Sequence, residues 1–375
     1  MKVALELQPC YWARSGIGTY TYELARRLTD RDGLEFCGNL FNLGGRKDNA
    51  EFLAGVAMPL RENKWMHYGV YRRLWNCLPL PYGNMFPNDA DLSLFFNFIV
   101  PPGVRGRVAT VVHDLTYLRY PETMKESNWQ HLSRGMPSSI ERSDRIITVS
   151  EFTKRELQEL LHIPAEKISV VYNAPSLVKE SVADTDVREK YGIPGEYILF
   201  VGTVEPRKNI ERLLRAFELL KNEQKIPHKL VLAGGKGWQD ECIFETVKQL
   251  RHADDVIFTG FVSAAEKNTL YQNASVFVFP SIYEGFGIPP LEAMSWGCPV
   301  VCANAASLPE VVGGAAELVD PFCVESIAEG MLRVLSDTDY AKKLCELGRA
   351  QAKRFSWDAS AEQLIAVCKD VLEKK

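Results

Sequence analysis

The sequence has no long hydrophobic run. Of its 375 residues 46% are hydrophobic and 25% charged, but no segment reaches the roughly 18 to 20 consecutive apolar residues that are needed to cross a bilayer. The N-terminal segment from Met1 to Leu7 has a charge inside an apolar strand pattern, which is not the form of a signal peptide. We therefore expect a cytoplasmic protein.

Positive charge and paired cysteines are also scarce. The net charge is -4, which argues against a broad nucleic-acid-binding surface. The nine cysteines are odd in number and include no Cys-x-x-Cys pair, which favours reduced thiols. Cys298 and Cys302 are close together without an accompanying histidine pattern, so we expect no zinc site. The phosphate-binding motif Gly-x4-Gly-Lys-Ser/Thr is absent, and no carboxylate cluster indicates magnesium.

Short apolar runs alternate with helical stretches along most of the chain, and its length suits two domains of ordinary size. The alternation stops in the polar segment from Lys179 to Glu189, which we interpret as a linker, and then starts again. This βα rhythm is typical of parallel sheets. We predict an α/β fold of two doubly wound domains, residues 1–178 and 179–355, followed by an amphipathic helix over 356–375.

The most informative stretch lies between Phe279 and Pro299. A buried strand ends at Phe279, a glycine turn follows, and Pro289 opens a helix, while Glu284 and Glu292 lie on either side of the junction. The turn consists of Gly285, Phe286, Gly287 and Ile288. Glycines allow close approach of a ligand, and a helix N-terminus favours a phosphate. The carboxylates suit sugar hydroxyls, but acidic residues that only complement the helix dipole would look the same.

A second candidate anion site opens the same half of the chain. Arg207 and Lys208 follow the buried strand that starts at Tyr197 and precede a helix. A guanidinium group can bind phosphate through two hydrogen bonds and an ammonium group acts as a point charge. Both turns belong to one predicted sheet, so a diphosphate could lie between them. An ordinary exposed Arg-Lys pair in a βα loop remains the alternative.

Together these motifs resemble the retaining family-four glycosyltransferases with the GT-B fold. The second half carries Glu284-x7-Glu292, the loop Gly-Thr-x-Glu-Pro-Arg-Lys-Asn and Ser307-Leu-Pro-Glu310. The first half matches more loosely, through Gly16-Ile17-Gly18 and His113-Asp114. The resemblance implies two Rossmann-like domains that face an interdomain cleft, with the last helix crossing back to the first domain.

The resemblance also implies roles for single residues. Glu284 corresponds to the glutamate that contacts hydroxyls of the transferred sugar, Glu292 to the one that holds the nucleotide ribose, and Arg207 with Lys208 to cations on the diphosphate. Many members have an arginine directly after the strand-ending glycine, where this chain has Thr203. We infer that Arg207 takes over that role.

Two sites in the first half complete the set implied by the resemblance. His113 corresponds to the histidine near the anomeric carbon of the sugar, although a strand-end histidine taken alone is more often structural. Gly16 and Gly18 correspond to a loop against the donor phosphates. Without the resemblance, this Gly-x-Gly would fit a dinucleotide fingerprint equally well, but the third glycine is missing.

We therefore predict retaining transfer of a hexose from a nucleoside-diphosphate sugar to a glycan or lipid-linked glycan. The Phe95-Phe-Asn-Phe98 stretch together with His-Asp and Glu-Pro-Arg-Lys-Asn resembles bacterial mannosyl- or rhamnosyltransferases of surface-polysaccharide assembly, which favours GDP-mannose as donor. Two cations and helix amides can neutralise a leaving diphosphate, so we expect no metal and no cofactor. A nucleotide-sugar epimerase, a phosphorylase and a non-catalytic glycan-binding protein remain as alternatives.

Residues Lys64 to Trp75 interleave aromatic and basic side chains. An interfacial helix has this composition, and a lipid-linked acceptor would make peripheral contact with the inner face of the membrane useful. A helix that packs its aromatic residues on the first domain has it too, and we slightly favour this second interpretation.

Overall fold

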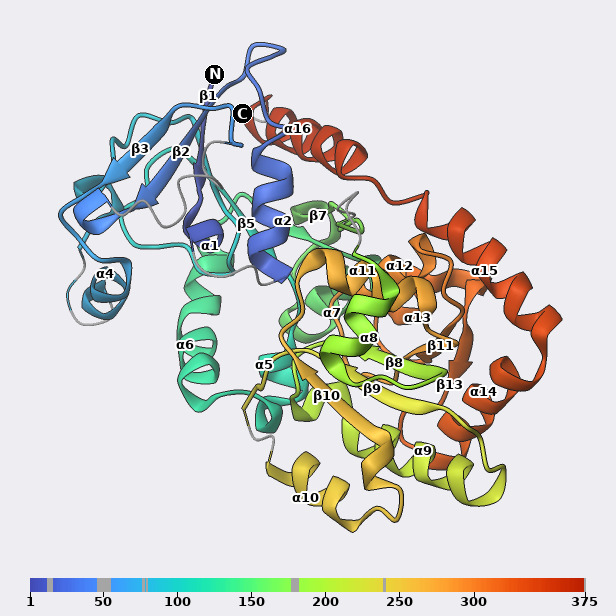
Figure 1. Ribbon diagram of the computed structural model, residues 1–375. Coiled ribbons are helices and arrows are strands. Elements are labelled where there is room, and N and C mark those ends of the chain that lie inside the picture. Colours follow the sequence, from blue (N-terminus) through green and yellow to red (C-terminus); the bar gives the residue numbers. More distant parts are fainter. Residues whose placement is uncertain are drawn as a thin grey trace. The chain divides into compact units, whose positions relative to one another are not determined.

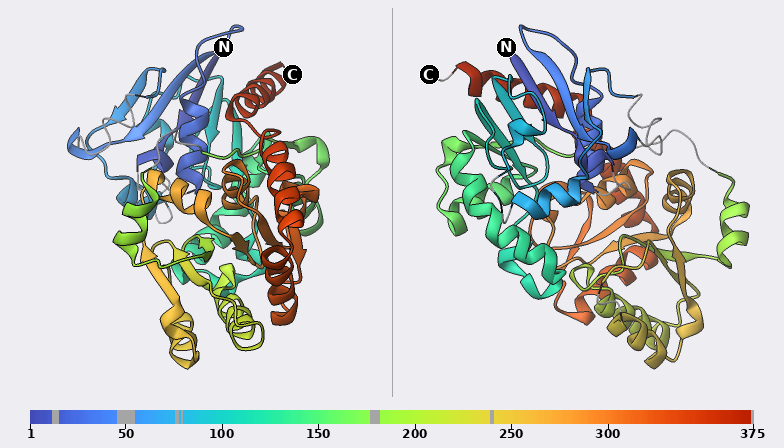
Figure 2. Two further views of the ribbon diagram at one scale, coloured as in Figure 1. Left: turned by 45° about the vertical axis from the view of Figure 1, so that its right-hand side comes forward. Right: turned by 90° about the vertical axis from the view of Figure 1, so that its left-hand side faces the viewer.

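A computed structural model describes residues 1–11, 16–45, 55–75, 78, 80–176, 182–238 and 241–373. The chain divides into two compact units. Unit 1 comprises Met1–Tyr117, Glu126–Asn173 and Ser356–Lys375, and unit 2 comprises Leu118–Lys125 and Ala174–Phe355. The division after Asn173 lies five residues before the predicted one at 178, and the sequence did not indicate that Leu118–Lys125 clusters with unit 2. Helices flank the sheet of each unit (Figures 1 and 2).

Unit 1 is built on a seven-stranded sheet in the order β3-β2-β1-β4-β5-β6-β7, with all pairs parallel. The strands are β1 (Lys2–Glu6), β2 (Glu35–Phe41), β3 (Leu60–Asn63), β4 (Leu92–Phe95), β5 (Arg107–Val112), β6 (Arg145–Thr148) and β7 (Ile168–Val170). The strand order reverses between β1 and β4. Ligands of such sheets bind outside the carboxyl ends of the strands at this switch point.

The helices of unit 1 include the C-terminal one. They are α1 (Gln8–Tyr11), α2 (Gly16–Ala25), α4 (Tyr68–Trp75), α5 (Thr116–Arg119, whose last two residues fall in unit 2), α6 (Glu126–Arg142), α7 (Glu151–Leu161) and α16 (Trp357–Glu373). The indole ring of Trp357 packs edge-on against Tyr20 of α2 with a centroid distance of 5.9 Å. Ser360 donates to the carbonyl of Tyr172 at 2.7 Å. Residues 356–373 are thus an integral part of unit 1.

Unit 2 repeats the same strand order with six parallel strands, β10-β9-β8-β11-β12-β13. The strands are β8 (Tyr197–Val201), β9 (Lys229–Ala233), β10 (Val256–Gly260), β11 (Val276–Phe279), β12 (Val300–Ala303) and β13 (Glu317–Val319). Its helices are α8 (Asp184–Tyr191), α9 (Ile210–Glu223), α10 (Glu241–Gln249), α11 (Ala264–Asn273), α12 (Ile288–Ser295), α13 (Leu308–Val312), α14 (Val324–Ser336) and α15 (Thr338–Ala352). The switch point lies between β8 and β11, which are buried throughout, as their apolar sequences predict.

The predicted linker over Lys179 to Glu189 is wrong in part, because helix α8 begins at Asp184. The segment looks polar in the sequence because Val187 is the one buried residue of this helix, and its other side chains are at least partly exposed. Arg188 pairs with Asp184 one turn earlier at 2.5 Å, and Gly192 ends the helix in the left-handed conformation. Residues 177–181 lie outside the described part of the chain.

Gly16 and Gly18, which the resemblance placed in a loop, are helical in the structure. Gly16 and Gly18 both belong to the first turns of α2, which ends at Ala25. Gly18 is buried, whereas a side chain added at Gly16 would meet no atom within 4 Å. These glycines therefore shape the start of a helix.

Helix α4 carries the aromatic and basic segment. Tyr71 is fully buried in an apolar cluster with Phe41 and Phe86, and Trp75 packs against the same cluster. Trp65, just before the helix, is 61% exposed. None of the helices in the described ranges combines the length and the apolarity that crossing a membrane requires.

Candidate active site

The switch point of unit 2 brings together the two turns that the sequence singled out. A short 3-10 helix, Pro206–Lys208, follows β8, and the loop with Glu284 follows β11. Asn209 connects them, because its Nδ2 donates to the carbonyl of Pro280 at 3.0 Å and to that of Pro321 at 2.6 Å. Its left-handed backbone, with φ of 61°, is a conformation that asparagine tolerates well.

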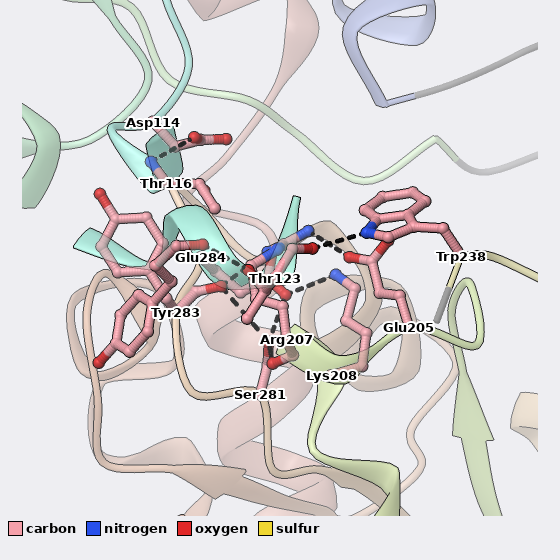
Figure 3. A network of polar contacts seen from close by, with 11 residues as sticks. Asp114, Thr116, Thr123, Glu205, Arg207, Lys208, Trp238, Ser281, Tyr283 and Glu284 are labelled. Carbon is pink, nitrogen blue, oxygen red and sulfur yellow. Dashed lines mark hydrogen bonds and ion pairs between the residues drawn. The ribbon is translucent and has the colours of Figure 1, made fainter. Parts of the chain in front are cut away.

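The carboxylate of Glu284 is the centre of a network of polar contacts (Figure 3). Its Oε1 accepts hydrogen bonds from Lys208 Nζ at 2.5 Å and from Ser281 Oγ at 2.6 Å, and its Oε2 lies 3.0 Å from Arg207 Nη1. Burial by itself would raise the pKa of Glu284, but the charges of Arg207 and Lys208 outweigh this effect and lower the pKa to about 2. Glu284 is therefore a fixed, ionised hydrogen-bond acceptor.

Arg207 is engaged on several sides. Besides Glu284, it donates from Nη1 to the carbonyl of Tyr283 at 2.6 Å and from Nη2 to Glu205 at 2.7 Å. Glu205 is 2% exposed. Arg207 and Lys208 are thus balanced by Glu205 and Glu284, and the predicted cation pair is embedded in a neutral network. The sequence analysis missed Glu205 and Ser281 as parts of this site, although Glu205 stands in the same motif as the cations.

Lys208 differs from Arg207 in its surroundings. Its ammonium group lies 5.2 Å from the ring centroid of Phe279, the last residue of β11. Among the described acidic residues, Glu284 is the one that pairs with Lys208, so one carboxylate holds it at the carboxyl edge of the sheet. An ammonium group that is held by one carboxylate and an aromatic face can accept a phosphate as a further partner.

The side chain of Ser307 holds the turn that follows Glu284. Its Oγ lies 2.8 Å from the carbonyl oxygen of Glu284 and 2.7 Å from that of Phe286. Gly285, Phe286 and Gly287 are buried, and Ile288 begins helix α12 with two prolines in its first turn. The turn that the sequence predicted at a helix N-terminus is therefore present.

Glu292 is separated from this network and has its own cation. It is 4% exposed, and both of its carboxylate oxygens lie 2.8 Å from Lys267 Nζ of α11. The hydroxyl group of Tyr271 donates to the same carboxylate at 3.3 Å. The sequence analysis did not identify Lys267 or Tyr271. Nothing in the sequence relates them to Glu292, because only the packing of α11 against α12 makes them neighbours.

His113, in unit 1, follows β5 and is 8% exposed. Its Nε2 donates to the carbonyl of Phe96 at 2.8 Å, and the ring of Tyr20 lies edge-on at 5.3 Å. Burial lowers the pKa of His113 against the opposing influence of that hydrogen bond. The imidazole is thus a neutral, oriented group with the proton on Nε2. The carboxylate of Asp114 accepts a hydrogen bond from Thr116 N, at the start of helix α5, at 2.9 Å.

Comparisons with known proteins identify the family and the fold of the chain. The family model "Glycosyltransferase Family 4" matches residues 14–176, and "Glycosyl transferases group 1" matches residues 184–351. O-antigen chain mannosyltransferase B of Escherichia coli is 32% identical over 97% of this chain and 98% of its own length. O-antigen chain mannosyltransferase RfbU of Salmonella typhimurium is 30% identical over 59% of this chain and 58% of its own.

Solved structures share the fold. Anabaena HepE, in a complex with UDP and glucose, superposes with a TM-score of 0.75 at 18% identity over 99% of this chain and 100% of that one. Sucrose-phosphate synthase of Thermosynechococcus elongatus superposes with a TM-score of 0.73 at 19% identity, covering 99% of this chain and 98% of that one. The chain therefore belongs to the family-four glycosyltransferases and is an enzyme with their GT-B fold.

Proposed function

We propose that this glycosyltransferase transfers mannose from GDP-mannose to a glycan or lipid-linked glycan acceptor in the biosynthesis of a surface polysaccharide, with retention of configuration. Two relatives, which match 97% and 59% of the chain, are named as O-antigen chain mannosyltransferases, and this supports both the sugar and the pathway class. Membership of a glycosyltransferase family favours transfer over the epimerase and the phosphorylase that the sequence had left open.

The observation that carries the proposal is the Arg207, Lys208 and Glu284 network at the switch point of unit 2. Lys208 would bind the diphosphate, while Arg207 would hold Glu284 and the Tyr283 carbonyl in place and add its charge. Glu284 would then accept hydrogen bonds from hydroxyl groups of the sugar. Glu292, fixed by Lys267, would bind the ribose hydroxyls.

The reaction needs a good leaving group more than a strong base. The bond from the anomeric carbon to the diphosphate oxygen breaks, and its electron pair leaves with the diphosphate. The acceptor oxygen forms the new bond to the anomeric carbon, and its proton passes to the leaving diphosphate. A positive group beside the leaving diphosphate stabilises the charge that develops there. We propose that the ammonium of Lys208, the guanidinium of Arg207 and the backbone N–H of Ile288 do this without a metal ion; Pro289 and Pro290, which follow it, have no N–H to offer.

Metal independence is tested by assaying transfer after treatment with EDTA. We expect full activity in the presence of the chelator. Complete loss of activity, with recovery on addition of magnesium, would overturn this part of the proposal.

The donor base is tested by thermal shift with GDP, UDP, ADP and dTDP, because a ligand that binds the native state raises its melting temperature. We expect the largest shift with GDP and a reduced shift with each nucleotide in Lys208→Gln. A larger shift with another nucleotide would replace GDP as the donor base. No shift with any of the four would remove the nucleotide site.

Peripheral membrane contact is proposed for the exposed side of the segment 64–75. Tyr71 and Trp75 pack inward, so Trp65 and Arg73 remain for an interface. Flotation with anionic liposomes should decrease when Trp65, Arg72 and Arg73 are substituted together. Equal flotation of the wild type and the triple variant would mean that the segment only packs against unit 1 and does not contact the membrane.

A further inference from the structure

The carboxyl edge of β1 and β2 carries three buried polar side chains whose hydrogen-bonding capacity is not filled. Glu6, Gln8 and Asn39 are 8%, 2% and 3% exposed. The carboxylate of Glu6 accepts one hydrogen bond, from Gln8 N at 3.1 Å. Among the described residues, none provides a hydrogen-bond partner for Gln8 Nε2 or Asn39 Oδ1. Buried polar atoms without partners are uncommon in native proteins and call for a water molecule or a ligand.

The three side chains lie at one place in the fold. Glu6 and Asn39 are direct partners in the parallel pairing of β1 with β2, and such partners point to the same face of a sheet. Gln8 reaches across the strand ends, since its Oε1 accepts from Phe41 N at 3.0 Å. Glu6 also ends the strand that pairs with β4, so this cluster stands at the switch point of unit 1. Figure 1 shows β1, β2 and α1 in this region.

The cluster of Glu6, Gln8 and Asn39 is mostly uncharged at neutral pH. None of the described lysines or arginines forms an ion pair with Glu6, and burial raises the pKa of this carboxyl to about 8, against the opposing hydrogen bond from Gln8. Glu6 is therefore mostly protonated at neutral pH and can both donate and accept. The cluster offers amide and acid groups that suit hydroxyls, and no positive charge that would suit a phosphate.

Aromatic rings border these polar groups. Tyr82 accepts a hydrogen bond from Asn39 Nδ2 at 3.2 Å, and Tyr68 packs against Phe41 with a centroid distance of 5.6 Å. Binding sites for small molecules typically combine aromatic walls with a few converging polar groups. The hydroxyl groups of a pyranose match these polar groups in chemistry, and its apolar faces match an aromatic ring.

We propose that Glu6, Gln8 and Asn39 form a subsite that binds hydroxyl groups of a neutral hexose residue of the acceptor. This inference rests on the proposed function, which assigns a glycan acceptor to the enzyme. Glu6, Gln8 and Asn39 have hydrogen-bonding capacity that the described residues leave unused, and sugar hydroxyl groups would satisfy it. A site that is built to bond a hydroxyl also rejects ligands that lack it.

The test uses the full chain and the variants Glu6→Leu and Glu6→Gln. Leucine has a similar volume and no polar atom, whereas glutamine keeps a neutral donor and acceptor, as the protonated acid does. Methyl α-D-mannopyranoside serves as the probe, by saturation-transfer NMR and as acceptor in transfer from GDP-mannose. We expect Glu6→Leu to raise the KM for the probe by roughly tenfold, which is the loss of about one hydrogen bond. Glu6→Gln should stay within about threefold of the wild type.

Two further measurements, the melting temperature and the thermal shift with GDP, distinguish the possible outcomes of this test. The melting temperature of Glu6→Leu should not fall, because an under-bonded polar group has been removed, and its thermal shift with GDP should match the wild type. Unchanged affinity of a stable Glu6→Leu for the probe, or no binding of the probe to the wild type, would overturn the subsite. Binding of the probe that depends on Glu6 while GDP does not bind would leave the subsite standing and remove the donor proposal instead.

Discussion

At the scale of single residues, the proposed donor site is a balanced set of charges. Lys208 and Arg207 face Glu284 and Glu205, and Glu284 is also bonded to Ser281. Substitution of one member leaves its partner buried without compensation, which is costly. The members should nevertheless differ in function, because Lys208 would touch the diphosphate and Glu284 the sugar.

We predict that Lys208→Gln weakens both nucleotide binding and transfer, whereas Glu284→Gln lowers transfer far more than nucleotide binding. The loss of one charge-assisted hydrogen bond in each case corresponds to about 1.5–3 kcal/mol, or roughly 10- to 100-fold. Isothermal titration with GDP and initial rates of transfer measure the two effects separately.

Lys342 provides the matched control, since its side chain is 71% exposed and its contact with Asp339 spans 3.9 Å. Lys342→Gln should change neither quantity. Equal GDP affinity of Lys208→Gln and the wild type would exclude Lys208 from the diphosphate site.

Glu6 and Glu284 should affect stability in opposite directions as pH changes. The folded-state pKa of Glu284 is lowered to about 2, so its contribution is present above the unfolded pKa near 4.5 and is lost as pH falls toward 2. The folded-state pKa of Glu6 is raised to about 8, so the folded state binds the proton more tightly and loses stability as pH rises from about 4.5 to 8.

We therefore predict that Glu6→Gln stabilises the protein at pH 8 more than at pH 5. Each pKa unit of difference between the two states corresponds to about 1.4 kcal/mol. Melting temperatures of the wild type and the variant across this range measure the effect. An equal difference at both pH values would show that Glu6 titrates normally.

At the scale of elements, the backbone conformation of Gly287 sets the direction in which the chain enters α12. Its φ is 120°, and a side chain there would bring Cβ within 2.6 Å of Leu308 Cδ2. Only glycine adopts this region readily.

We predict that Gly287→Ala lowers the stability by about 1–3 kcal/mol and displaces the Glu284 loop, so that transfer falls as well. Gly16→Ala is the matched comparison, because Gly16 lies in helix α2 with no atom within 4 Å of the added Cβ. That substitution should stabilise the protein by about 0.5–1 kcal/mol. Denaturant unfolding of both variants tests the contrast, and similar changes in the two would contradict it.

The elements that the sequence predicted best are those with strong local signals. Helix α7 (Glu151–Leu161) has such a signal at its start, where the Ser150 side chain accepts from Thr153 N. Strands β3 and β13 were not predicted, because Leu60–Asn63 and Glu317–Val319 are short and partly exposed. Helix α8 was missed because its polar surface resembles that of a linker.

At the scale of the whole molecule, the chain passes between the units after Tyr117, Lys125, Asn173 and Phe355. Unit 1 therefore depends on the C-terminal helix. The buried apolar residues of α16 are Trp357, Ala361, Leu364, Ile365, Cys368 and Val371. Asp370 pairs with Arg145, whose side chain is 9% exposed.

We predict that deletion of residues 356–375 destabilises unit 1 severely and leaves GDP binding by unit 2 intact. Each large apolar side chain that is exposed corresponds to about 1.5–3 kcal/mol, so several of them approach the whole stability of a domain. Differential scanning calorimetry should show an early transition that GDP does not shift and a later one that GDP raises. A truncated protein whose GDP-sensitive transition also moves to lower temperature would contradict the division.

The pattern of two parallel sheets, the glycine turn into α12 and the charged residues after β8 and β11 can all be read from the chain without a structure. These features are local, because burial, helix capping and positive φ act over a few neighbouring residues. Which charges meet follows from the folded arrangement alone. Glu292 lies on Lys267 of another helix, Glu284 bridges the ends of β8 and β11, and Glu6 with Asn39 shares one face across two strands. Such pairs depend on the register of strands and the packing of helices, which arise from the side chains of the whole unit together.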